Sequence, residues 1–133
     1  MQKTKKIALS GTIVCMMLFM MTSFAFAAWS SAISVSLPPW GATVDNYSVG
    51  VAKTSSSSSF GAYGVKETNS LDPHAMLINS NGESRSAWTA IRQGQTITSS
   101  SNSGLIGYIY YSRAGSNAIE PNQTQVQYQF NPY

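Results

Sequence analysis

Apolar and polar residues alternate with a period of two along much of this chain. The clearest runs are 33–37, 47–51 and 126–130, where Ile, Val, Leu, Tyr or Phe alternates with Ser, Gly or Gln. Such alternation is typical of strands with one face toward a core and the other toward water. Shorter apolar runs predict further strands at 61–66, 75–79, 87–91, 95–99 and 105–112.

For two of these runs the sequence also predicts a place in the sheet, central or at the edge. The run 105–112 (LIGYIYYS) carries bulky residues on both faces, which predicts a central strand covered on both sides. The run 125–130 (QVQYQF) has no charged residue. Charged side chains usually keep further strands from adding to a sheet edge. We expect this uncharged run to be the edge strand that is open to such addition.

Turn signals separate the runs at short and fairly even spacing. The sharpest is Asn81-Gly82, which predicts a type I′ hairpin joining 75–79 to the region around Arg85. The serine run 55–59 predicts a flexible connection, and a short helix over 84–92 is the one local alternative. Together the runs predict an all-β fold, a single antiparallel β-sandwich of about seven or eight short strands, with a small barrel as the alternative.

The N-terminal 27 residues have the three parts of a secretory signal peptide. Lys3, Lys5 and Lys6 precede an uncharged apolar run at 7–21, and Ala25-Phe26-Ala27 follows. This order predicts cleavage between Ala27 and Ala28 and a secreted or wall-associated domain at 28–133. An uncleaved membrane anchor is the alternative, because the apolar run is close to the roughly 20 residues that span a bilayer.

Removal of residues 1–27 changes the charge and the chemistry of the chain. Five basic and five acidic residues remain, so the net charge of +3 falls to zero. Without excess basic residues we do not expect nucleic acid as a partner, and we expect membrane association only through the signal peptide. Zero net charge also favours self-association, because copies of the domain repel one another little. Cys15 is the only cysteine, so the mature domain can have no disulfide or zinc-thiolate site, which for a secreted protein favours a bacterial wall or medium.

Candidate catalytic chemistry is sparse. His74 is the only histidine, Asp72 lies two residues before it, and the carboxylates are scattered. We expect no enzymatic activity, no metal site and no cofactor.

Aromatic residues give the best prediction of a binding surface. Tyr and Trp combine a flat apolar face with a polar tip, which suits sugar stacking and protein interfaces. Most of these rings are equally suited to a core, and we expect Trp40 and Tyr133 to be the most exposed. The candidate binding residues are Trp40, Trp88, Tyr108, Tyr110 and Tyr133.

One stretch resembles a known family. The segments HAMLINSNGE (74–83), SAWTA (86–90) and YIYY (108–111) follow in the order found in lactococcin-type bacteriocins. The resemblance implies a small cysteine-free β-sandwich that blocks cell-wall synthesis by binding a wall precursor. This chain differs by continuing for 22 residues beyond Tyr111 and by lacking a histidine-rich N-terminal part. It also resembles small exported proteins of Gram-positive bacteria.

The sequence thus leads to three hypotheses of function. The first is a small secreted, non-enzymatic protein that binds a cell-wall component or another protein at or outside the wall. The second is a lactococcin-like bacteriocin that interferes with wall synthesis. The third is an extracellular structural protein that assembles by strand addition.

Overall fold

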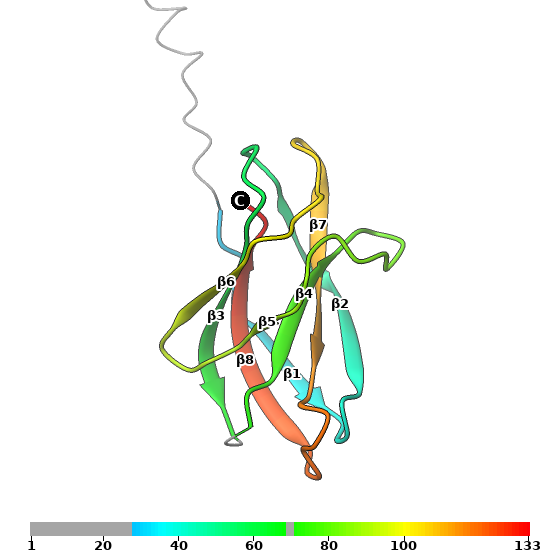
Figure 1. Cartoon of the computed structure of the whole chain (residues 1–133), viewed down its shortest axis with the longest axis vertical. Coiled ribbons are helices and arrows are strands. Elements are labelled where there is room, and N and C mark those ends of the chain that lie inside the picture. The colour runs from blue at the N-terminus through cyan, green and yellow to red at the C-terminus, as the bar shows by residue number, and fades with distance from the viewer. Residues whose placement is uncertain (1–27, 69–70) are drawn as a thin grey trace, which may run out of the picture.

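The computed structural model describes residues 28–68 and 71–133, and this part of the chain is all-β (Figure 1). The predicted signal peptide, including Ala27 of its cleavage site, lies outside the described residues, and Ala28 is exposed. The strands are β1 (Ile33–Leu37), β2 (Thr43–Ala52), β3 (Phe60–Glu67), β4 (His74–Ile78), β5 (Thr89–Ala90), β6 (Thr96–Ser99), β7 (Ile109–Gly115) and β8 (Thr124–Asn131). No helix occurs in the described residues, so the helical alternative at 84–92 is wrong.

The strands form two four-stranded antiparallel sheets that pack as a sandwich, as the alternation predicts. One sheet has the order β1-β8-β3-β6, and the other has the order β2-β7-β4-β5. Strand β2 breaks its register with β7 between Asn46 and Val51. The Asn46 side-chain oxygen accepts hydrogen bonds from the Ser48 and Val49 backbone amides at this break (3.2 and 3.3 Å). This irregularity bends a long outer strand.

The core lies between the sheets and uses the predicted alternation. In β8, Val126, Tyr128 and Phe130 are buried while Gln125 is exposed. Burial raises the pKa of Tyr128 to about 12, and its hydroxyl lies 2.7 Å from the buried Ser112 hydroxyl of the other sheet. A polar pair of this kind fixes the relative position of the two sheets because each hydroxyl would otherwise be buried without a partner.

Two of the strand predictions are wrong in position. The run 105–112 is not a central strand from its start, because β7 begins only at Ile109 and Leu105 to Ile109 are exposed. The run 125–130 is not an edge strand, because β8 pairs with β1 on one side and β3 on the other. The run 87–91 is a strand only at Thr89–Ala90.

Both ends of the described chain lie at one end of the sandwich, here named the upper end (Figure 1). The Ser30 amide donates to the Phe130 carbonyl (2.8 Å), and the rings of Trp29 and Tyr133 are 6.4 Å apart. All eight strands and the whole core cluster lie within 33–131. These strands and this core are those of the described residues, and on that basis we expect residues 28–133 to fold without the 27 residues before them.

Candidate functional site

Two hollows meet near the upper end, between the β4–β5 loop (79–88) and the β6–β7 loop (100–108). Their volumes are about 570 and 510 Å³, and both are lined by Arg85 and Ser103. We call the combined surface the groove. Its polar part is lined by Ser58, Ser84, Arg85, Ser86, Ala87, Ser101, Asn102 and Ser103. Its apolar part adds Asn79, Ser80, Leu105, Tyr108, Ile109 and Tyr110.

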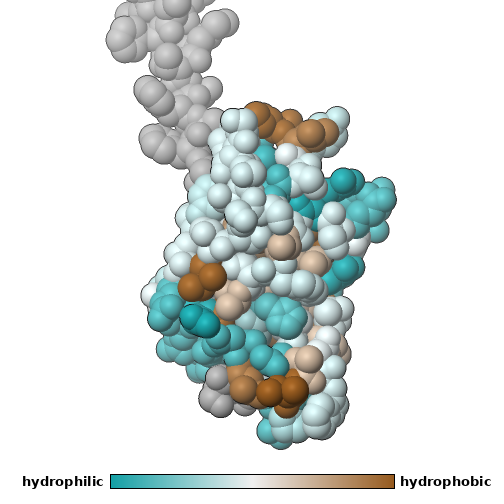
Figure 2. All heavy atoms as spheres, in the orientation of Figure 1, coloured by the Kyte–Doolittle hydropathy of each residue, from teal (hydrophilic) through white to brown (hydrophobic). Residues whose placement is uncertain are grey.

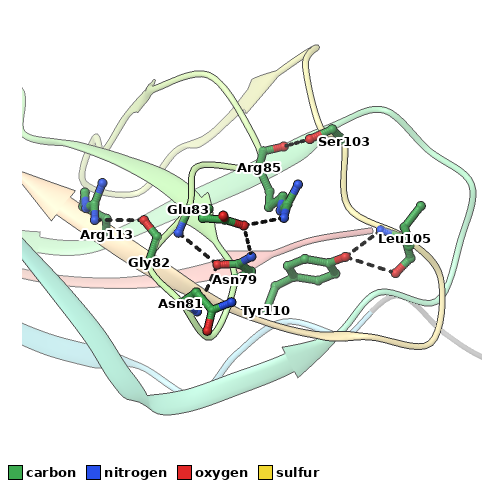
Figure 3. A network of polar contacts seen from close by, with 9 residues as sticks. All are labelled: Asn79, Asn81, Gly82, Glu83, Arg85, Ser103, Leu105, Tyr110 and Arg113. Atoms are coloured by element: carbon green, nitrogen blue, oxygen red, sulfur yellow. Dashed lines mark hydrogen bonds and ion pairs between the residues drawn. The ribbon is translucent and has the colours of Figure 1, made fainter.

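The hairpin after β4 builds one wall of the groove (Figure 3). The Asn79 side-chain oxygen accepts from the amides of Asn81 and Glu83 (3.0 and 2.9 Å). Gly82 takes a positive φ of 78°, but Asn81 does not, so the hairpin forms where it was predicted while its predicted type I′ geometry is wrong. The Asn79 side-chain amide then donates to Glu83 Oε2 (2.6 Å), which also accepts from Arg85 Nη2 (2.8 Å). The turn thereby holds the guanidinium of Arg85 at the groove.

Tyr110 joins the opposite wall to the sandwich. Its ring is buried, and its hydroxyl accepts a hydrogen bond from the Leu105 amide (2.6 Å). Figure 3 shows this hydroxyl pointing at Leu105 across the loop. The bond fixes the second half of the β6–β7 loop, while Tyr108 beyond it is 62% exposed. The groove therefore offers one accessible aromatic ring on a braced loop.

The groove is polar without carrying a net charge. Arg85, its only lining cation, is paired with Glu83. Its lining includes six serines: Ser58, Ser80, Ser84, Ser86, Ser101 and Ser103. The hydroxyls of Ser84, Ser86 and Ser103 already donate within the protein, so a ligand would use them mainly as acceptors. Hydroxyls both donate and accept hydrogen bonds, so the surface suits an uncharged ligand that is rich in hydroxyl or amide groups.

The backbone of both loops is already paired across the polar part. The Ser103 amide donates to the Arg85 carbonyl (2.7 Å), and the Ala87 amide donates to the Ser101 carbonyl (3.1 Å). A peptide strand added here would find these groups occupied. A ligand in this part of the groove therefore depends on side chains.

The structure brings together two of the five predicted binding residues, Tyr108 and Tyr110. Trp40 is 66% exposed, but it lies beside Glu120 at the lower end of the sandwich. Trp88 packs edge-on against His74 with ring centroids 4.4 Å apart. Tyr133 is half-buried against Trp29, so the expectation that it is among the most exposed rings is wrong.

His74 and Asp72 do not form a catalytic pair. Asp72 Oδ2 accepts from Arg92 Nε (2.7 Å), while His74 is half-buried against Trp88 and burial lowers its pKa. Across the described part of the chain, no three His, Cys, Asp or Glu side chains gather in a way that could hold a metal ion. None of the described groove residues is a histidine or a carboxylic acid.

The sequence analysis did not identify Arg85, Ser103 or Leu105 as site residues. Leu105 belonged to a run that resembles a buried strand, and nothing in the sequence places Ser103 beside Arg85. The Asn81-Gly82 turn was the one available signal, because a tight hairpin projects the residues that follow it.

Comparisons with known proteins give no identification. No protein-family model, curated protein or solved structure shows a significant match to the chain. In the described residues, no helix is long and apolar enough to cross a membrane.

Proposed function

We propose that this chain is a small exported, non-enzymatic protein that binds an uncharged carbohydrate of the cell wall in the groove. The observation that carries this proposal is the pairing of a serine-rich polar part with the exposed ring of Tyr108. Sugars present hydroxyls at their edges and weakly polar C–H faces. The first kind of group suits serine and asparagine side chains, and the second suits a tyrosine ring.

The charge of the groove favours a neutral sugar over an anionic wall polymer. Arg85 is neutralised by Glu83 at 2.8 Å, and the domain 28–133 has no net charge. An acidic polymer needs several unpaired cations to replace its counterions. Binding to a neutral glycan should therefore change little between low and moderate salt.

The edges of the sheets give little support to assembly by strand addition. Of the four outer strands, β5 and β6 have two and four residues, and β2 is broken by its register shift. The fourth, β1, is a regular and uncharged edge, but it has only five residues. Short or bulged edges are poor templates for a further strand. The groove therefore supports binding better than the edges support assembly.

The test is co-sedimentation of residues 28–133 with insoluble Gram-positive cell walls. We expect the domain to pellet with walls and to stay soluble alone, and neutral glycan fragments released from the walls should compete. Tyr108→Ala should weaken binding about tenfold, because a central aromatic contact is worth about 1.4 kcal/mol or more.

The matched control is Trp40→Ala. Trp40 is as exposed as Tyr108 but lies at the opposite end, so its removal should leave wall binding unchanged. Equal losses in the two variants, or sedimentation without walls, would contradict a site in the groove.

A further inference from the structure

An apolar surface projects from the upper end and includes part of the groove lining. Leu105, Ile106, Tyr108 and Ile109 are 63, 56, 62 and 56% exposed, with only Gly107 between them. We call these four side chains the apolar tip. Figure 2 shows hydrophobic atoms gathered at this end of the molecule, over the loop that leads into β7. A cluster of large apolar side chains on a soluble domain usually marks a contact with a partner or a membrane.

The backbone of the apolar tip is hydrogen-bonded within the protein. The Leu105 amide donates to the Tyr110 hydroxyl (2.6 Å), and the Tyr108 amide donates to the Leu105 carbonyl (3.4 Å). The Gly107 amide donates to the Lys53 carbonyl (2.9 Å), and the Lys53 amide donates to the Tyr108 carbonyl (3.0 Å). Unpaired backbone groups are what normally keep a loop out of lipid. This loop has most of its groups paired before any contact is made.

Lys53 also ties the apolar tip to the chain ends. Its backbone holds Gly107 and Tyr108, while its ammonium donates to the Pro132 and Tyr133 main-chain oxygens (2.9 and 3.2 Å). The Tyr133 ring in turn contacts Trp29. The chain therefore enters the domain at the end that carries the apolar tip.

The residues before the domain constrain the distance between this end and a membrane. The uncharged apolar run ends at Met21, and the domain begins at Ala28. The intervening residues can span at most about 25 Å when fully extended. A sandwich still joined to a membrane-inserted 7–21 run thus has its apolar tip within reach of the lipid surface.

We propose that the apolar tip docks on the surface of a lipid bilayer, with the sandwich standing on its upper end. The occupant is the interfacial layer of an uncharged membrane, because the nearest ion pair, Arg85 with Glu83, is neutral. Tyr108 has the amphipathic ring that favours the headgroup region. Leu105, Tyr108 and Ile109 also line the apolar part of the groove, so lipid and a glycan would compete for these three side chains, whereas Ile106 does not line it.

The experiment labels residues 28–133 with a polarity-sensitive fluorophore at a single cysteine. The domain has no natural cysteine, since Cys15 is the only one, so Ile106→Cys and Ile119→Cys each give one label. Ile119 is the matched control, because it is 70% exposed at the lower end. We expect phosphatidylcholine vesicles to shift the emission of the label at 106 to the blue and to leave the label at 119 unchanged, in low and high salt alike.

Vesicle flotation of unlabelled variants completes the test. Ile106→Glu should weaken flotation about tenfold or more, because a charge replaces an apolar side chain at the interface, and Ile119→Glu should float as the parent does. Since Ile106 does not line the groove, Ile106→Glu should still bind cell walls. That result separates failure of the bilayer contact from failure of the proposed function. No shift at 106, equal shifts at both positions, or flotation only with anionic vesicles at low salt would overturn the proposal.

Discussion

Lys53 is a buried cation whose partners are main-chain oxygens. Its ammonium donates to Ser57, Pro132 and Tyr133 (2.5, 2.9 and 3.2 Å), and burial lowers its pKa. The side chain is almost fully covered. Its hydrogen bonds connect the serine run 55–59 and the C-terminal residues to Lys53, which directly follows β2.

Lys53→Met should lower the free energy of unfolding by about 1–3 kcal/mol, because the Ser57 and Tyr133 main-chain oxygens lose their donor. The Pro132 carbonyl still accepts from the Asn102 side-chain amide (2.7 Å). Chemical denaturation of residues 28–133 measures the change. Lys66→Met is the control: Lys66 is exposed, and its replacement should change stability by less than about 0.5 kcal/mol. Equal losses would show that the Ser57 and Tyr133 oxygens do not need Lys53.

Asp45 and Arg113 form a two-pronged pair between β2 and β7. Arg113 Nε donates to Asp45 Oδ1, and Nη2 donates both to Asp45 Oδ2 (2.8 Å) and to the Gly82 carbonyl (3.1 Å). The hydrogen bonds from Arg113 lower the pKa of Asp45 against the opposing effect of burial. The pair thus links an outer strand to the hairpin of the groove.

Asp45→Asn should reduce the free energy of unfolding at pH 7 by about 1 kcal/mol. A carboxyl whose pKa is lower in the folded state stabilises the fold above its unfolded pKa, and it loses this contribution as the pH falls through its folded pKa. The gap between the parent and the variant should therefore begin to shrink as the pH falls below about 4, and it should close only below the lowered pKa of Asp45 in the folded state. Denaturation curves across pH 2–8 check this.

The control for Asp45→Asn is Asp72→Asn. Asp72 pairs with Arg92, whose side chain is more exposed, so water screens the pair and its loss should cost less than about 0.5 kcal/mol. A gap between the parent and Asp45→Asn that stays constant down to pH 2 would contradict the assigned role of the charge.

At the scale of elements, the turn at Gly82 sets the position of the groove wall. Gly82→Ala should cost about 1–2 kcal/mol, because an L-residue is strained at a φ of 78°. Its Cβ would also lie 2.9 Å from the Tyr47 hydroxyl, which hydrogen-bonds Asp45. We expect weaker wall binding as well, since the same turn holds Glu83 and Arg85. Denaturation and wall co-sedimentation measure the two effects.

Gly94→Ala is the control that separates backbone strain at a positive φ from the steric contact that a Cβ at position 82 would make. Gly94 has a φ of 74°, and a Cβ there meets no atom within 4 Å. Its replacement should cost about 1 kcal/mol while wall binding is kept. A comparable loss of wall binding in Gly94→Ala would remove the link between the turn and the groove.

The alternation in β1 and β8 was sufficient to predict these strands and their buried faces. The alternation could not predict which strands lie beside β1 and β8. A period of two shows which face of a strand is buried, but it contains no information about the order of strands in the sheet. QVQYQF was therefore expected at an edge, although β8 lies between β1 and β3. The apolar run 105–112 was misplaced for a related reason: an exposed apolar loop and a buried strand have the same local composition.

For the candidate site as well, the local sequence could not predict which loops meet to form the groove. Tyr108 and Tyr110 were predicted from their side-chain chemistry, and the structure places both there. Arg85 and Ser103, which are 18 residues apart in the chain, meet because the Ser103 amide and hydroxyl both donate to the Arg85 carbonyl. Such a pairing depends on how the sheets stack, which local sequence does not encode.

At the scale of the whole molecule, the groove and the apolar tip occupy one end, and the lower end carries Trp40 and Ile119. The upper end also receives both termini, as the contact between Trp29 and Tyr133 shows. The two proposed contacts, with a wall glycan and with lipid, thus fall on the same side of the sandwich. The loop at 116–123 is the part of the fold farthest from both.

The closeness of Trp29 and Tyr133 makes the fold almost a closed loop of chain. A short linker from Tyr133 to Ala28 could close it, and a new opening between the exposed Pro121 and Asn122 would break no strand. Such a circular permutant would start and end at the lower end, with every strand pairing intact. A fused protein would then be attached at the end that the proposed contacts leave free, whereas a tag placed after Tyr133 would lie close to Lys53.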